Sequence, residues 1–387
     1  MLRVITWRSG TVVSLGTVWQ GAQELTVDTG TGAPVRALAY PELVGTPAAG
    51  DRVLLNVSAQ ARGLGTGGYA LVVARPDAPH VDPPAGPGHL VKARYTPMQA
   101  MVLGVDEQES AHHEALRDAD DLTGLPVVVA DLHSAVPAVV AGIRHGAESR
   151  GVRPPRVVYV MTDGGALPAW FSRTVSGLRD AGWIDSCVTV GQAFGGDLEA
   201  VSLHSGLLAA RIVREADVVV VAQGPGNLGT GTRWGFSGVA AGEAVNAAAV
   251  LGGRPVASLR VSAADPRPRH RGVSHHSLTA YGRVALAPAD VPVPVADPAD
   301  PLDQGASGVA APDARATFLA GLRDQAASIC SPKGPHRLVE APAGQGLLTA
   351  LGRCPVRLST MGRGLADDPE AFLAAAAAGV RAADLLG

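Results

Sequence analysis

The sequence is poor in several kinds of residue, and each shortage excludes a class of protein. Charged residues make up only 17% of the 387 residues and hydrophobic residues 47%, a balance that excludes an intrinsically disordered chain. The formal net charge of −3 lacks the strong positive bias of proteins that bind nucleic acid through its phosphates. Lysine occurs only at Lys92 and Lys333, so chemistry that needs a lysine has two candidates at most.

Cysteines are also few and lie far apart, at Cys187, Cys330 and Cys354. Their spacing gives neither a CxxC pair nor a disulfide framework, which favours a reducing cytoplasm. The N-terminus has no long apolar core of the signal-peptide type, and no apolar run reaches the roughly 18 residues that a membrane span needs. A P-loop, a G-x-S-x-G elbow and an H-E-x-x-H metal motif are missing as well. We therefore expect a cytoplasmic protein without a membrane partner.

What is present divides the chain into two parts. Residues 1–75 hold short segments rich in Val, Leu and Thr between Gly, Pro and Asp turns, which predicts a small β-barrel of the OB or SH3 kind. A Pro-rich linker at 76–89 follows. From 90 to 387, Val-rich runs alternate with helix-length stretches, which predicts a doubly wound, mostly parallel, Rossmann-like α/β sheet. We expect a Pro- and Asp-rich insertion near 288–305, and Asp368 as the cap of the last helix.

Polar residues follow the predicted strands directly, at the edge where parallel sheets bind ligands. Asp131 and His133 come after one Val-rich run, and Asp163 comes after the next. We expect these three to share one pocket with His275 or His276, and we assign catalytic acid–base roles to Asp131, His133, Asp163 and His276. The alternative interpretation is that these residues are polar only because they lie in loops.

The same residue types also suit a divalent metal ion. The candidate ligands are Asp131, His133, His204 and His275, although their spacing matches no short metal motif. Neighbouring His275 and His276 cannot both face one point in a regular strand. We therefore expect only one of these two histidines in the site.

A glycine-rich stretch, QGPGNLGTGT, is the sharpest motif. Gly224, Gly226 and Gly229 satisfy G-x-G-x-x-G directly after a Val-rich run, Thr230 follows, and the next residues are typical of a helix. Such glycines let the backbone approach a phosphate at a helix N-terminus. Pro225 removes one N–H donor, and the next strand carries an arginine where a dinucleotide site has an acidic residue. A phosphate or anion site, an ordinary glycine turn and a nicotinamide site all stay open.

A basic loop follows the next predicted strand. Its cationic and imidazole side chains are Arg267, Arg269, His270, Arg271, His275 and His276. Arginine forks match the oxygens of phosphate and carboxylate, so we expect Arg269 and Arg271 to contact an anion. The alternative is a solvated basic loop.

Several longer strings in the chain are specific. Among them are VVVADLHSAVPAV, QGPGNLGTGTRWGFSG, VSHHSLTAYGRV and LSTMGRGLADDPEAFLAAAAAG. Together they resemble an uncharacterised, full-length family of high-GC Gram-positive bacteria that is known only as a domain of unknown function. The resemblance implies a cytoplasmic single-chain protein but no activity, so it assigns no role to any residue.

The leading functional hypothesis is an enzyme that acts on a phosphorylated or nucleotide-like small molecule at the strand carboxyl ends, as a metal-assisted hydrolase or transferase. One alternative is a non-catalytic small-molecule sensor or binding protein whose barrel binds a partner. A weaker alternative is an NADP-dependent oxidoreductase. We expect an anionic small molecule and not nucleic acid as the partner, and a homo-oligomer stays open.

Overall fold

The computed structural model divides the chain into two compact units. The first consists of Met1–Leu103 and Trp170–Ser176, and the second of Gly104–Ala169 and Gly177–Gly387. The structure describes residues 5–65, 67–78, 82, 84–302, 312–330 and 336–386. None of the described helices is long and apolar enough to cross a membrane.

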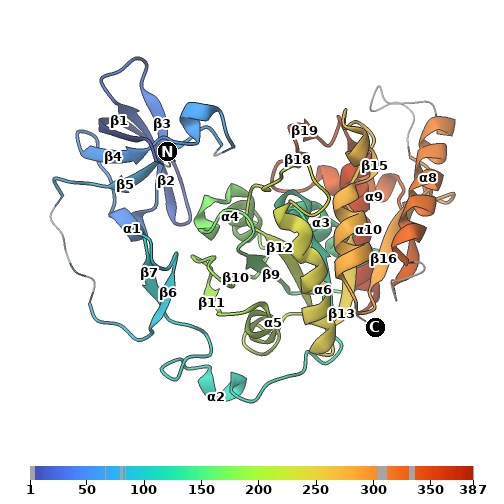
Figure 1. The fold of residues 1–387 in the computed structure, drawn as a ribbon. Helices are drawn as coiled ribbons and strands as arrows, with labels where there is room; N and C mark the ends of the chain where they lie inside the picture. The colour runs from blue at the N-terminus through green and yellow to red at the C-terminus, as the bar shows by residue number, and fades with distance from the viewer. Residues whose placement is uncertain are drawn as a thin grey trace. The chain divides into compact units, whose positions relative to one another are not determined.

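The first unit is built on a closed five-stranded β-barrel (Figure 1). Its strands are β1 (Trp7–Trp19), β2 (Ala22–Asp28), β3 (Val35–Ala39), β4 (Arg52–Asn56) and β5 (Ala70–Ala74). They follow one another in the order β1-β2-β3-β5-β4, and β4 closes the barrel by pairing with β1. Alternate side chains such as Leu25, Val27 and Leu55 fill its core, as the period of a strand requires. The predicted N-terminal barrel is confirmed.

Beyond the barrel, the described residues of the first unit form only short elements. These are α1 (Pro41–Val44), η1 (Gln60–Arg62), β6 (Leu90–Lys92) and β7 (Ala100–Val102), while η3 (Ala169–Phe171) and α4 (Arg173–Asp180) bring residues from later in the chain. The predicted linker 76–89 falls between β5 and β6, and its residues 79–81 and 83 lie outside the described residues. Its role as a domain boundary stays a prediction.

The second unit contains an eight-stranded sheet in which all the strands are parallel. In spatial order these are β11 (Leu198–Glu199), β10 (Ser186–Thr189), β9 (Val157–Thr162), β12 (Val218–Gln223), β8 (Pro126–Ala130), β13 (Arg254–Ser258), β16 (Asp290–Val295) and β17 (Arg337–Pro342). β8 and β12 are buried along their whole length, as strands of a sheet covered on both faces must be. The mixed α/β class and the Rossmann-like sheet are therefore confirmed.

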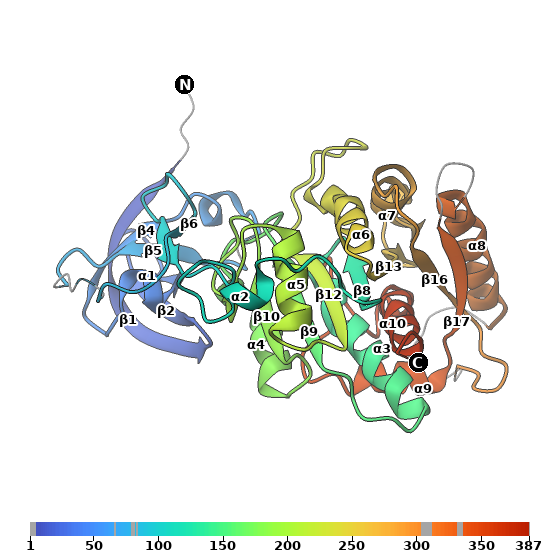
Figure 2. The ribbon, with the colours of Figure 1, turned by 90° about the horizontal axis from the view of Figure 1, so that it is seen from below.

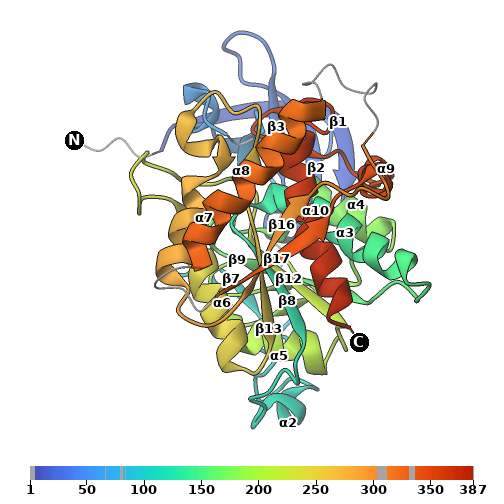
Figure 3. The ribbon, with the colours of Figure 1, turned by 90° about the vertical axis from the view of Figure 1, so that its right-hand side faces the viewer.

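Helices cover both faces of this sheet (Figures 2 and 3). On one face lie α3 (Val136–Ser149), α9 (Gln345–Gly352) and α10 (Pro369–Asp384), and on the other lie α5 (Leu203–Ile212), α6 (Ala240–Val250), α7 (His275–Thr279) and α8 (Pro312–Cys330). α3 and α10 approach closely because Gly142 has no side chain. A Cβ at Gly142 would lie 2.0 Å from the carbonyl oxygen of Ala376.

The smaller elements of the second unit connect these layers. They are α2 (His113–Leu116), η2 (His133–Ala135), η4 (Ser237–Val239), β14 (Val261–Ser262), η5 (Pro268–His270), β15 (Gly272–Val273), the π-helical turn η6 (Ala280–Val284), β18 (Ser359–Thr360) and β19 (Arg363–Gly364).

The chain reverses its direction across the sheet at β8. From β8 it passes through α3 to β9 on one side, whereas from the neighbouring β12 it passes through α6 to β13 on the other side. Such a reversal opens a crevice beyond the carboxyl ends of the two strands, where ligands bind in open α/β sheets. Asp131 follows β8 and Gln223 ends β12, so both lie at this switch point.

Part of the predicted insertion is a strand of the sheet. Within the stretch 288–305, Asp290–Val295 form the sheet strand β16 and not an insertion; residues 303–305 lie outside the described residues. The strand tolerates its prolines because successive backbone N–H groups point to opposite edges of a strand. Pro292 and Pro294 are two residues apart, so the N–H groups that they lack belong to the same edge, and the other edge keeps its donors. β16 pairs with β17 along its whole length but pairs with β13 only at Asp290.

Asp368 occupies the N-cap position of α10, as predicted, but its side chain makes no capping hydrogen bond. Its carboxylate instead accepts hydrogen bonds from the Ser262 hydroxyl and the main-chain N–H of Ala263. Asp368, at the start of α10, therefore fixes the loop that follows β13 instead of capping its own helix.

Candidate functional site: a histidine cluster beside an arginine-lined pocket

Asp131 brings a buried carboxylate to the switch point. Only 2% of its surface is exposed, and Gln223 Nε2 donates to its main-chain oxygen over 2.8 Å. Its Oδ2 has no hydrogen-bond partner among the described residues and lies 3.5 Å from Nδ1 of His276. A buried carboxylate with one oxygen unsatisfied is expensive, which is a reason to look for function here.

His275 and His276 open helix α7 and lie side by side. Ser274 caps this helix by accepting a hydrogen bond from the main-chain N–H of His276. Successive residues in a helical turn are rotated by roughly 100°, not by the 180° of a strand, so both rings reach the same region. Their centroids are 4.5 Å apart. The strand assumed in predicting that only one of them lies in the site is not present, because the two residues open a helix.

A third ring, that of His270, completes what we call the histidine cluster: His270, His275 and His276. His270 comes from η5, and its Nδ1 makes a 2.8 Å hydrogen bond with Oγ of Ser274. One ring nitrogen from each of the three histidines lies within 4.8 Å of the other two. The sequence placed His270 in the basic loop but gave it no role of its own.

Two rings of the cluster, those of His275 and His270, are kept neutral by burial. Burial, together with a smaller contribution from the neighbouring His276, lowers the pKa of His275 to about 4. Burial also lowers the pKa of His270 to about 3, with a further contribution from the positive charge of Arg260. Both rings are therefore neutral at pH 7 and have a nitrogen lone pair available for a ligand.

His276 is held by two neighbouring side chains. Its ring stacks on Phe236 with centroids 3.8 Å apart and planes 6° from parallel. Arg260 donates from Nη1 to Nδ1 of His276 over 3.0 Å, and since a guanidinium only donates, this nitrogen is the acceptor. Burial lowers the pKa of Arg260, and the charge of Asp131 opposes that effect. Arg260 thus connects the histidine cluster to the carboxylate at the switch point.

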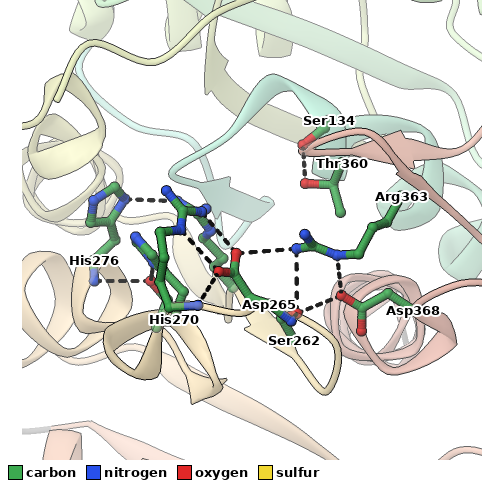
Figure 4. Close-up of polar contacts among 11 residues, drawn as sticks. Ser134, Ser262, Asp265, His270, His276, Thr360, Arg363 and Asp368 are labelled. Carbon is green, nitrogen blue, oxygen red and sulfur yellow. Dashed lines mark hydrogen bonds and ion pairs between the residues drawn. The ribbon is translucent and has the colours of Figure 1, made fainter.

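An ion-pair network fixes the loop that carries the cluster (Figure 4). Asp265 accepts hydrogen bonds from Arg267 over 2.8 Å and from Arg363 over 3.1 Å, and Arg363 also donates to Asp368 over 3.1 Å. These hydrogen bonds, with that of Arg267 the strongest, hold the pKa of Asp265 well below its usual range. Arg267 is therefore committed to the protein and is not free to bind an anion.

A small cavity of about 30 Å³ lies beside Asp131. Arg260, Ser258 and Thr360 are among the residues that line it, and Thr360 makes a hydrogen bond with Ser134 over 3.1 Å (Figure 4). The volume holds about two water molecules. This cavity is too small for a substrate but large enough for water beside the carboxylate.

A second pocket is much larger, about 760 Å³, and His275 is one of the residues that line it. We call it the arginine pocket. Its lining consists of Gly231, Arg233, Trp234, Arg269, His275, Leu278, Thr279, Gly282, Arg283, Ala285, Leu286 and Ser328. The pocket thus joins the loop after β12, the basic loop, α7 and η6, with three arginines and an exposed tryptophan on its walls.

These features belong to a chain whose family is known. Residues 36–379 match the family model described as protein of unknown function (DUF3866). The chain belongs to this family. No curated protein is similar enough to match it. The family assigns no activity, so the site has to be interpreted from its own geometry.

The glycine-rich stretch differs from the dinucleotide fingerprint. The helix predicted directly after it begins only at Ala240, preceded by the turn η4, so Gly224, Gly226 and Gly229 do not open a helix. Gly224 instead lets two loops meet, since a Cβ there would lie 2.3 Å from the carbonyl oxygen of Ala166. The far part of the loop folds back on itself.

That fold-back is made by hydrogen bonds within the loop. The main-chain N–H of Thr230 donates to the carbonyl oxygen of Gly235, and Gly229 pairs with Phe236. Gly226 has a φ of +92° and open space around it. The loop therefore reaches the arginine pocket through its tip at Gly231, Arg233 and Trp234, and not through the three glycines of the motif.

The other predicted catalytic residues have hydrogen-bond partners outside the cluster. His133 is buried, and its Nδ1 makes a 3.0 Å hydrogen bond with the hydroxyl of Tyr159. Asp163 follows β9 but accepts from the main-chain N–H of Gln192. Of the predicted metal ligands, His204 is exposed on α5, and only His275 belongs to the cluster. Of the two predicted anion contacts, Arg269 lines the pocket and the exposed Arg271 does not.

Several site residues were missed from the sequence. Arg233, Trp234 and Arg283 line the pocket, and Phe236 and Arg260 hold His276. The available signal was the spacing of three histidines, H-x-x-x-x-H-H, beside a serine that can cap a helix. That combination predicts a helix start at His275, where both neighbouring histidines lie in one helical turn.

Proposed function

We propose that this protein is an enzyme that acts on a phosphorylated or nucleotide-like small molecule bound in the arginine pocket. The observation that carries the proposal is that three arginines, an exposed tryptophan and His275 of the histidine cluster line the same pocket. The volume of about 760 Å³ lies in the range of small-molecule sites, which is ~300–1,000 Å³.

The charge of the pocket favours an anion. Arg233, Arg269 and Arg283 are the charged residues of its lining, and none of the described residues in that lining is acidic. Arginine forks bind phosphate oxygens with two parallel hydrogen bonds. Trp234 is 55% exposed and offers a flat face on which a nucleobase can stack. Together these groups suit a molecule with a phosphate at one end and an aromatic base at the other.

Acid–base groups lie beside the pocket. His275 belongs to its lining, its ring is 4.5 Å from that of His276, and His276 in turn lies 3.5 Å from Asp131. This arrangement supports Asp131 in the acid–base role that the sequence predicts, with His276 between its carboxylate and His275. His133 and Asp163 have other partners, and we assign them no role in the reaction. We also infer a cytoplasmic location, because the three cysteines are unpaired.

The test is a calorimetric and turnover screen of the full chain against nucleotides and sugar phosphates. Arg269→Ala is compared with Arg271→Ala, a matched control on an exposed arginine that does not line the pocket. A hydrogen bond between charged groups contributes about 1.5–3 kcal/mol, so Arg269→Ala should weaken binding about tenfold or more. Arg271→Ala should bind like the wild type.

Equal binding by both variants, or no binding of any phosphorylated compound, would contradict the proposal. Binding without turnover of any compound would replace the enzyme by a small-molecule sensor. Trp234→Ala separates nucleotides from simple phosphates, since it should weaken nucleotide binding by about five- to hundredfold but leave sugar phosphates unchanged.

A further inference from the structure

The histidine cluster has the composition and geometry of a metal site. We propose that His270, His275 and His276 together bind one divalent ion of the zinc class. The proposal depends on the geometry of the three rings and holds whether or not the substrate proposed above is correct.

The distances are close to those that a metal needs. Zinc binds histidine nitrogen at about 2.0–2.1 Å, so nitrogens around a tetrahedral ion lie about 3.4 Å apart. One nitrogen from each ring already lies within 4.8 Å of the others. Side-chain rotations have to close the remaining gap, and His276 has to give up its hydrogen bond with Arg260, because a neutral imidazole offers only one lone pair.

Two of the three rings are fixed in advance. His270 is bonded to Ser274, and His276 is stacked on Phe236. The same Ser274 caps the helix that carries the other two histidines, so one residue sets the geometry of the whole cluster. Metal sites need such support, because partners beyond the ligands orient the rings that bind the ion.

Two unsatisfied atoms point to a missing ligand. Nε2 of His275 is buried and has no hydrogen-bond partner among the described residues, and the same is true of Oδ2 of Asp131. Asp131 lies 3.5 Å from His276 and supplies a negative charge next to the cluster. A divalent ion would satisfy the first atom directly and would balance the second, which otherwise remains a buried carboxylate oxygen without a hydrogen bond.

The donor set selects the class of ion. Imidazole nitrogens suit zinc, cobalt, nickel and copper, whereas magnesium and calcium prefer sets of oxygen ligands. Three histidine ligands leave a coordination position open, as in catalytic zinc sites. His275 also lines the arginine pocket, so the ion lies next to the space where an anion would bind. This ligand set replaces the one predicted from the sequence, in which His133 and His204 took part.

The direct test is a Zn²⁺ titration of the full chain after removal of metal by EDTA, in competition with a chromophoric chelator. We expect one tight site per chain. His275→Ala, on a half-buried residue, should weaken Zn²⁺ binding more than about 100-fold, and Asp131→Asn should weaken it about 10- to 100-fold. His204→Ala, which removes an exposed histidine of the earlier set, should leave the affinity unchanged.

Circular dichroism establishes that each variant is folded, and Co²⁺ provides a second readout. The wild type should show the visible bands of Co²⁺ with nitrogen ligands, and His275→Ala should lose them. Absence of a stoichiometric Zn²⁺ site in the wild type, or equal affinity in a folded His275→Ala variant, would overturn the proposal. Zn²⁺ binding without any binding of phosphorylated compounds would keep the metal site and reject the proposed substrate.

Discussion

Replacing His133 by asparagine should change how the stability of the α/β unit depends on pH. His133 is buried, and burial lowers its pKa to about 4, against about 6.5 for a histidine in an unfolded chain. Between these values the unfolded chain binds a proton that the folded protein does not bind. The free energy of unfolding therefore decreases as the pH falls from about 6.5 to about 4.

The size of this effect follows from the shift. One pKa unit corresponds to 1.36 kcal/mol, and the pKa of His133 is lowered by about 2.5 units. His133 therefore makes the free energy of unfolding about 3 kcal/mol lower at pH 4 than above pH 6.5. Asparagine keeps a polar group near the hydroxyl of Tyr159 but does not titrate. The variant should be less stable than the wild type at pH 7, and the difference should shrink by about 3 kcal/mol at pH 4.

The measurement is urea unfolding of both proteins at pH 7, 6, 5 and 4. His270, His275 and His336 also have pKa values lowered by burial, but they are present in both proteins and cancel in the comparison. A difference in stability that stays constant from pH 7 to pH 4 would refute the account of His133 as a buried neutral histidine.

Four further substitutions test the fold. Gly142→Ala should lower the free energy of unfolding by about 1–3 kcal/mol, because the added methyl group meets the backbone of α10. Gly321→Ala, in helix α8 with open space around it, should raise the free energy of unfolding by about 0.5–1 kcal/mol. Urea unfolding compares the two variants. Gly226→Val should cost about 1 kcal/mol or more because φ is +92°, which thermal unfolding detects as a lower Tm. Arg363→Ala should destabilise by about 3–5 kcal/mol, because it removes a partner from the buried carboxylate of Asp265; an unchanged Tm would contradict the network.

Much of the fold was predictable because burial on both faces leaves a clear pattern. β8 and β12 appear as uninterrupted apolar runs, and the barrel strands as short segments between turn residues. β16 was missed because Pro292 and Pro294 usually exclude a strand from a sheet interior. Only the pairing of neighbouring strands reveals that these prolines leave the ladder with β17 intact.

The site was predictable in its position but not in its membership. Asp131 follows a buried strand, and strand ends are where ligands bind, so its place at the rim could be inferred. His276 and His270 meet through a helix start at Ser274, which a periodicity argument based on strands does not see. Arg233 and Trp234 reach the pocket at the tip of a loop that folds back on itself, and no local sequence pattern specifies that path.

The central claim is that the histidine cluster and the arginine pocket form one functional site. A crystal structure of the full chain with Zn²⁺ and a nucleotide, with anomalous diffraction recorded at the zinc absorption edge, tests it most directly. The account predicts one anomalous peak between His270, His275 and His276, with the phosphates of the nucleotide against Arg269. A zinc peak elsewhere on the chain, or a nucleotide bound away from this pocket, would contradict it.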